Sequence, residues 1–119
     1  MTTQWADLVS KNKQAASAFQ ATNPKMLEAF RALNAAQPGP GKLDAKTREL
    51  ISLAIAVTTR CEGCIGSHAA AAVKAGATAE EVSEALGVAI ALNAGAAYVY
   101  SLKVLDAVGE FSSHASGAT

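Results

Sequence analysis

The sequence Arg60-Cys61-Glu62-Gly63-Cys64-Ile65-Gly66-Ser67-His68, with Glu49 upstream, joins the two central predicted helices, residues 44–59 and 62–76. Its pattern is E-x11-C-x2-C-x3-H, and it holds both cysteines and one of the two histidines of the 119 residues. On a helix that begins near residue 62, positions 61, 64 and 68 follow one another along one face. Two thiols a turn apart, with an imidazole a turn further on, are the components of a dithiol redox centre.

Helix signals surround this segment on both sides. Asp44 is a suitable N-cap for the helix that carries Glu49, and Gly76 is a suitable left-handed terminator for the next helix. Thr78-Ala79-Glu80-Glu81 has the form of a capping box that opens a further helix. Since no segment alternates β-branched and polar residues with a period of two, the sequence predicts an all-α fold.

Together with these signals, the remaining helix-start and helix-stop residues predict about six helices in one domain of residues 1–111. Asn23-Pro24 provides an N-cap and a proline at the first helical position. Pro38-Gly39-Pro40-Gly41 predicts a loop, and Asn93-Ala94-Gly95 predicts a break or a kink in the last apolar segment. The small and polar residues 112–119 predict a disordered tail, which includes His114 as a solvated side chain.

The charge and composition exclude several classes of partner. Ten basic and ten acidic residues give a net charge of zero, and the sequence pI is about 6.7. We therefore expect no binding to nucleic acid or to an acidic membrane surface. The N-terminus has no signal-peptide pattern, and Gly87, Asn93 and Gly95 interrupt the apolar segment 85–102, which favours a packed helix over a membrane span. We expect a reducing cytoplasm, where a CxxC pair is typical of redox or metal chemistry.

The apolar content also predicts an oligomer. Half of the residues are hydrophobic and only 17% are charged. A chain of this size has a high ratio of surface to volume and cannot bury all of these hydrophobic side chains in its own core. Some of them should therefore be buried between subunits. The aromatic candidates for such contacts are Trp5, Phe19, Phe30, Tyr98 and Tyr100.

The site residues can be ordered by helix geometry. The first turn of a helix has unpaired N–H groups and a positive dipole end, which favours the thiolate form of Cys61 and, less strongly, of Cys64. In an antiparallel hairpin turning near residue 60, Glu49 should meet His68 before it meets either sulfur. Glu49 would then orient His68, which would act on Cys64, and Cys61 would resolve a sulfenic acid formed there. Such a site suits peroxide reduction.

Other interpretations of the same residues stay open. A zinc site would need Glu49 and His68 as ligands beside Cys61 and Cys64, which is an uncommon ligand set. The two cysteines could instead be small buried hydrophobic residues, and Glu49 an ordinary acid near a helix start. The sequence contains no flavin or nicotinamide fingerprint, so we expect no cofactor, no resident metal and an external source of electrons.

At these residues the chain resembles the AhpD-like alkylhydroperoxidase / carboxymuconolactone decarboxylase family. The resemblance spans roughly residues 40–108, including the segments 43–51, 76–82 and 93–95. It implies an AhpD-like helical bundle that assembles as a homotrimer or homohexamer. It also implies hydroperoxide reduction with a dithiol reductant, such as a lipoyl protein or a thioredoxin-like protein. Carried over to this chain, Cys64 would react with the peroxide and Cys61 would exchange with the reductant.

One position departs from the family pattern. The peroxidases of the family have a histidine directly before the second cysteine, where this chain has Gly63. The sequence therefore predicts a weak to moderate alkylhydroperoxidase with catalytic residues Cys64, Cys61, His68 and Glu49. The alternatives are a carboxymuconolactone-type decarboxylase that uses Glu49 and His68 as acid and base, and a non-enzymatic redox or zinc-binding module.

Overall fold

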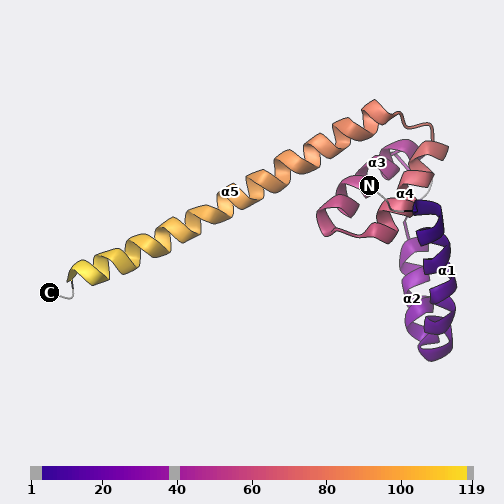
Figure 1. Ribbon diagram of the computed structural model, residues 1–119, viewed down its shortest axis with the longest axis horizontal. Coiled ribbons are helices and arrows are strands. Elements are labelled where there is room, and N and C mark those ends of the chain that lie inside the picture. The colour runs from indigo at the N-terminus through magenta and orange to yellow at the C-terminus, as the bar shows by residue number, and fades with distance from the viewer. Residues whose placement is uncertain (1–3, 38–40, 118–119) are drawn as a thin grey trace.

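The computed structural model of the protein describes residues 4–37 and 41–117, and every regular element in these ranges is an α-helix. In chain order they are α1 (Trp5–Thr22), α2 (Pro24–Ala35), α3 (Ala45–Thr59), α4 (Glu62–Lys74) and α5 (Ala79–Gly117). The pair α1 and α2 forms a hairpin on one side of the molecule, α3 and α4 form the centre, and α5 extends away from them (Figure 1). The predicted all-α class is confirmed, and most of the loop predicted at residues 38–41 lies outside the described residues.

The predicted caps fix the ends of the central helices. Asp44 is the N-cap of α3, where its Oδ1 accepts the N–H of Thr47 at 2.8 Å. Hydrogen bonding from the side chain and the backbone N–H of Thr47 holds the pKa of the Asp44 carboxyl below its ordinary value. Asn23 stands at the N-cap position of α2 but makes no side-chain capping bond, whereas Pro24 occupies the first helical position as predicted.

The chain reverses between α4 and α5 at Gly76. Gly76 has a φ of 86°, and its N–H donates to the carbonyl of Val73. The N–H of Ala77 donates to the carbonyl of Ala72, which completes a Schellman motif. A glycine is required here because left-handed backbone strains residues that have a Cβ.

The start of α5 is held by a capping box and an ion pair. Thr78 and Glu81 exchange hydrogen bonds of 3.1 Å and 2.9 Å, as the sequence predicts. Lys46 Nζ lies 2.7 Å from Glu81 Oε2, which ties the first turn of α3 to the first turn of α5. The hydrogen bond from Lys46 lowers the pKa of Glu81, and the same bond raises the pKa of Lys46.

The predicted break at Asn93-Ala94-Gly95 is wrong, because α5 is one continuous helix of 39 residues. Asn93 donates from its side-chain amide to the carbonyl of Ala89 at 2.7 Å and to Thr58 Oγ1 at 2.9 Å. The amide therefore finds its partners without opening the helix, and one interior glycine costs only about 1 kcal/mol relative to alanine. The described chain consequently has five helices instead of about six. Helix α5 also includes residues 112–117, for which the sequence predicts a disordered tail.

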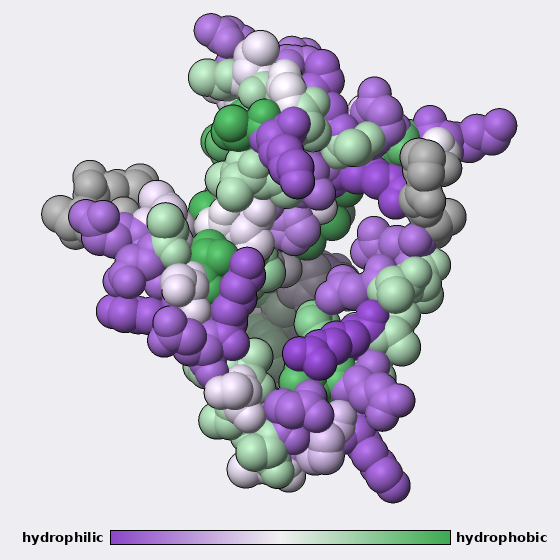
Figure 2. Space-filling model, turned by 90° about the vertical axis from the view of Figure 1, so that its right-hand side faces the viewer, coloured by the Kyte–Doolittle hydropathy of each residue, from purple (hydrophilic) through white to green (hydrophobic). Residues whose placement is uncertain are grey.

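The buried core of the chain is small. Among the described residues only Leu53, Ala56, Ala72 and Ala89 are buried hydrophobic side chains. They lie where α3 packs on α4 and on the first half of α5. Seen from the side of α1 and α2, hydrophobic residues gather toward the middle of the molecule and hydrophilic residues cover its outer edges (Figure 2). The central position predicted for α3 is correct, although Ile51, Ile55 and Val57 remain 41–56% exposed.

Candidate redox site at the start of helix α4

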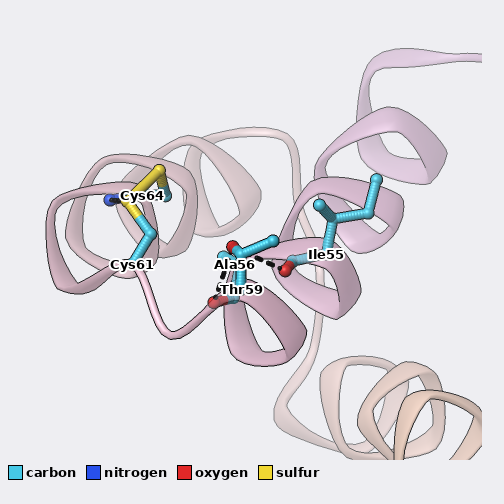
Figure 3. The surroundings of a disulfide bond; sticks show 5 residues. All are labelled: Ile55, Ala56, Thr59, Cys61 and Cys64. Carbon is cyan, nitrogen blue, oxygen red and sulfur yellow. Dashed lines mark hydrogen bonds between the residues drawn. A yellow bond between two sulfur atoms is a disulfide. The ribbon is translucent and has the colours of Figure 1, made fainter. Parts of the chain in front are cut away.

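The two cysteines form a disulfide at the N-terminus of α4. Cys61 is the N-cap residue and Cys64 lies in the first turn, with a Cα–Cα distance of 5.2 Å between them. Cys61 Sγ also accepts the backbone N–H of Cys64 at 3.2 Å (Figure 3). A sulfur that serves as the N-cap acceptor sits at the positive end of the helix dipole, which stabilises negative charge on it when the pair is reduced.

The turn between α3 and α4 places Cys61 at this N-cap. Arg60 adopts left-handed backbone with a φ of 56°, and the N–H of Cys61 donates to the carbonyl of Ala56. Thr59 Oγ1 donates to the carbonyls of Ile55 and Ala56 in the last turn of α3 (Figure 3). A non-glycine residue in this region stores backbone strain, and such strain is concentrated at functional sites. The turn thus directs the cysteine pair into the start of α4.

Glu49 and His68 form the second half of the site. Glu49 Oε2 lies 2.7 Å from His68 Nδ1, so the contact between α3 and α4 that the hairpin geometry predicts is present. The Glu49 side chain is 22% exposed and the His68 side chain is 40% exposed. Because Nδ1 is engaged by the carboxylate, Nε2 is the ring nitrogen left to exchange a proton with another group. His68 follows Cys64 by one turn on the same helix.

Helix α1 packs against α4 beside Gly63 and Gly66, a contact that the sequence did not predict. A Cβ built on Gly63 would stand 2.8 Å from Asn12 Nδ2. A Cβ on Gly66 would stand 2.8 Å from Val9 Cγ2 and 3.5 Å from the Trp5 ring. The two glycines therefore allow α1 to approach α4 closely, and the Asn12 amide occupies the space beside Gly63. The sequence signal was present as two glycines three residues apart on one helix face.

An apolar cavity of about 480 Å³ lies between α3, α4 and the start of α5. It is lined by Leu53 and Val57 of α3, Ile65 and Ala69 of α4, and Leu86 of α5, among others. Ile65 directly follows Cys64 in the chain, but neither cysteine nor the Glu49–His68 pair lines the cavity. Its apolar walls suit a hydrocarbon group better than a charged one.

The zinc alternative finds no ligand set in the described part of the chain. Within residues 4–37 and 41–117, no three His, Cys, Asp or Glu side chains are grouped so that they could hold a metal ion together. Of the four side chains that a zinc site would need, the two cysteines are bonded to each other and Glu49 is paired with His68.

The chain is similar to several proteins of known sequence. It is 57% identical over 107 residues to an uncharacterized protein of Haemophilus influenzae, an alignment that covers 90% of this chain and 95% of that protein. It is 41% identical over 83 residues to uncharacterized protein 4 in the cox locus of Paracoccus denitrificans, which covers 70% of this chain and 75% of that protein. The names of these relatives state no activity, so the similarity to them does not indicate a reaction.

A solved structure has the same fold. The crystal structure of an apo carboxymuconolactone decarboxylase family protein from Legionella pneumophila superposes with a TM-score of 0.69 at 35% sequence identity. The match covers 91% of this chain and 96% of that chain. Residues 24–107 also match the carboxymuconolactone decarboxylase family as a whole. With the AhpD-like resemblance of its central segment confirmed in this way, the chain belongs to the carboxymuconolactone decarboxylase family.

Proposed function

We propose that the protein is a thiol-dependent peroxidase that reduces organic hydroperoxides by cycling between the Cys61–Cys64 dithiol and its disulfide. The observation that supports this most directly is the position of the disulfide. Both cysteines stand at the positive end of α4, one turn before a histidine that is already paired with a carboxylate. A thiolate source, a resolving thiol and a proton carrier are thus contributed by a single helix and its neighbour α3.

The reaction begins with the Cys64 thiolate. It attacks one oxygen of the hydroperoxide, an S–O bond forms, the O–O bond breaks, and the alkoxide leaves as an alcohol after taking a proton from His68. Cys61 then attacks the Cys64 sulfenic acid, an S–S bond forms, the S–O bond breaks, and water leaves. Glu49 holds the His68 ring through Nδ1 during the proton transfer.

An external dithiol restores the site. One of its sulfurs attacks Cys61 and releases the Cys64 thiolate, and its second sulfur then resolves the mixed disulfide and leaves both cysteines reduced. The two electrons that reduced the peroxide therefore come from this donor, for which a lipoyl protein or a thioredoxin-like protein is the expected class. We place the reaction in a reducing cytoplasm, and in a homotrimer or homohexamer of the kind that the family resemblance implies.

The expected substrate carries an alkyl group. The apolar cavity lined by Ile65, the residue after Cys64 in the chain, offers space for hydrocarbon. Among the residues that line it, Thr78 and Ser83 are the polar ones, and none is charged. A hydrophobic hydroperoxide should therefore be preferred over hydrogen peroxide.

A peroxide-consumption assay tests the proposal. Cumene hydroperoxide would be supplied with dihydrolipoamide or with a reduced thioredoxin as donor. We expect Cys64→Ser to abolish turnover, and Cys61→Ser to consume one equivalent of peroxide and stop at a sulfenic acid that dimedone traps. His114→Asn, a change on the exposed end of α5, is the matched control and should keep full activity. Full activity in both cysteine variants would contradict a dithiol peroxidase, and exchanged behaviour would reverse the two roles.

A second candidate function rests on the Glu49–His68 pair by itself. A carboxylate paired with an imidazole at 2.7 Å can move a proton without any thiol, as decarboxylation of a lactone acid requires. This reaction would survive the double change Cys61→Ser/Cys64→Ser and be lost in His68→Asn. The peroxidase activity would be lost in the double cysteine variant, so one pair of assays separates the two functions.

A further inference from the structure

Helix α1 packs against α4 through a face that is apolar at one end and polar at the other (Figure 1). Trp5, Val9 and Asn12 follow one another by steps of four and three residues, so they lie on one side of α1. Trp5 and Val9 lie beside Gly66, and Asn12 lies beside Gly63, one turn nearer to the start of α4. Asn12 is therefore the polar end of this face, next to the turn that carries the two cysteines.

The amide of Asn12 directs its nitrogen at this turn. Nδ2 lies 2.8 Å from the position of a Cβ on Gly63, and Cγ lies 4.0 Å from the same position. The difference is close to the length of an amide C–N bond, about 1.33 Å, so this bond points almost straight at residue 63. The amide oxygen lies more than 4 Å away. The side chain thus offers hydrogen-bond donors to the first turn of α4 and directs its acceptor elsewhere.

A donor at this place needs an acceptor, and the first turn of a helix contains few. The backbone N–H groups of this turn are donors themselves. Cys61 Sγ already accepts the N–H of Cys64 at 3.2 Å. The Cys64 side chain leaves the helix about 100° around its axis from position 63. Its sulfur becomes a strong acceptor when the disulfide is reduced and the thiol loses its proton.

We propose that the Asn12 amide donates a hydrogen bond to the Cys64 thiolate and thereby favours the reduced cysteine pair over the disulfide. In the disulfide form the amide lies beside Gly63, where the absence of a side chain leaves room for it. Reduction releases Cys64 from Cys61, and a rotation of the Asn12 side chain completes the bond. This inference rests on the dithiol cycle of the proposed function, but it does not depend on which oxidant closes the disulfide.

An equilibrium with dithiothreitol tests the proposal. Dithiothreitol gives two electrons and two protons to the protein disulfide, which becomes two thiols, while its own thiols close to a cyclic disulfide. The Cys64 thiol then releases its proton to the solvent. We expect Asn12→Ala to lower the equilibrium constant for reduction about tenfold at pH 7, since a hydrogen bond to a charged sulfur is lost. Asn34→Ala is the matched control and should leave the constant unchanged, because α2 has no contact with α4 in the described residues.

A change at Gly63 removes the same hydrogen bond without altering Asn12. The methyl group of Gly63→Ala would displace the Asn12 amide, which is the end of an exposed side chain. We expect the same fall of about tenfold, and no further fall in the double variant Asn12→Ala/Gly63→Ala. Because alanine favours a helix more than glycine does, Gly63→Ala should not lower the free energy of unfolding. Loss of structure therefore cannot account for its redox effect, whereas additive effects in the double variant would contradict a shared hydrogen bond.

Alkylation by iodoacetamide identifies the sulfur that accepts the bond. In the Cys61→Ser background, Asn12→Ala should slow the alkylation of Cys64 about tenfold at pH 7, because less thiolate is present. In the Cys64→Ser background, the same change should leave the alkylation of Cys61 unaltered. Slowing at Cys61, or an unchanged dithiothreitol equilibrium in both Asn12→Ala and Gly63→Ala, overturns the proposal. Neither measurement uses a peroxide, so a failure of the proposed peroxidase function would appear separately, in the peroxide-consumption assay.

Discussion

The carboxylate of Glu49 lies 2.7 Å from Nδ1 of His68, although nineteen positions separate the two residues in the chain. The contact joins α3 to α4 one turn beyond the cysteine pair. It fixes which nitrogen of the imidazole faces the carboxylate and leaves the other nitrogen for proton exchange. The partly buried carboxylate thereby obtains a partner that offsets its desolvation.

Removing the charge of Glu49 should impair catalysis without unfolding the protein. Glu49→Gln keeps the size of the side chain but removes the carboxylate charge that faces His68 Nδ1. We expect peroxidase activity to fall about 10²-fold, the low end of general-base contributions. Thiolate absorbance of Cys64, followed against pH in the Cys61→Ser background, should move to higher pH when Glu49→Gln is added. Glu84→Gln on α5 is the control, and an unchanged titration would leave Glu49 with a structural role only.

The cysteine pair should oxidise within one chain. Cys61 and Cys64 are 5.2 Å apart at their Cα atoms, inside the range of disulfides. One equivalent of peroxide should therefore convert the reduced protein to a form lighter by two hydrogens, with no covalent dimer. Intact-mass spectrometry and non-reducing electrophoresis measure this. Disulfide-linked dimers as the main product would argue against the proposed centre.

A methyl group at Gly66 should separate α1 from α4. A Cβ there would stand 2.8 Å from Val9 Cγ2, so the Val9 side chain or its helix would have to shift, and the Trp5 ring lies 3.5 Å away. We expect Gly66→Ala to lower the free energy of unfolding by about 1–3 kcal/mol, the usual cost of overpacking. Gly87→Ala is the matched control, since nothing lies within 4 Å of its Cβ position. That change should instead stabilise α5 by about 0.5–1 kcal/mol, and equal effects of the two changes in denaturant titrations would refute the close packing.

The Lys46–Glu81 contact predicts a loss of stability in acid. The hydrogen bond from Lys46 lowers the pKa of Glu81 in the folded protein below its ordinary value of 4.5. The contribution of this carboxylate is therefore complete above pH 4.5 and is lost as the pH falls through the lower folded-state pKa. Glu81→Gln should melt at a lower temperature than wild type at pH 7, and the difference should shrink as the pH falls below 4.5. Glu80→Gln in the same turn is the control, and a constant difference across this range would exclude the ion pair as its source.

Several local features could be predicted because they depend on neighbours in sequence. The N-cap at Asp44, the capping box of Thr78 and Glu81 and the left-handed Gly76 each satisfy backbone groups within four or five residues. The spacing of Cys61, Cys64 and His68 likewise fixes one helix face before any packing is known. Even the meeting of Glu49 with His68 could be inferred, since a hairpin that turns at residue 60 relates the two helices by simple lengths.

Other features were decided only by the tertiary structure. The sequence 93–95 has the composition of a break, but Thr58 on α3 supplies a partner for the Asn93 amide, and α5 continues as one helix. The approach of Asn12 to Gly63 depends on how α1 crosses α4, which no local pattern specifies. The sequence by itself thus determined where helices start and end and which side chains share a face, because hydrogen bonding along the backbone is short-ranged. Which faces meet, and which helix remains unbroken and extended, follow from contacts between distant segments and could be decided only once those segments were packed.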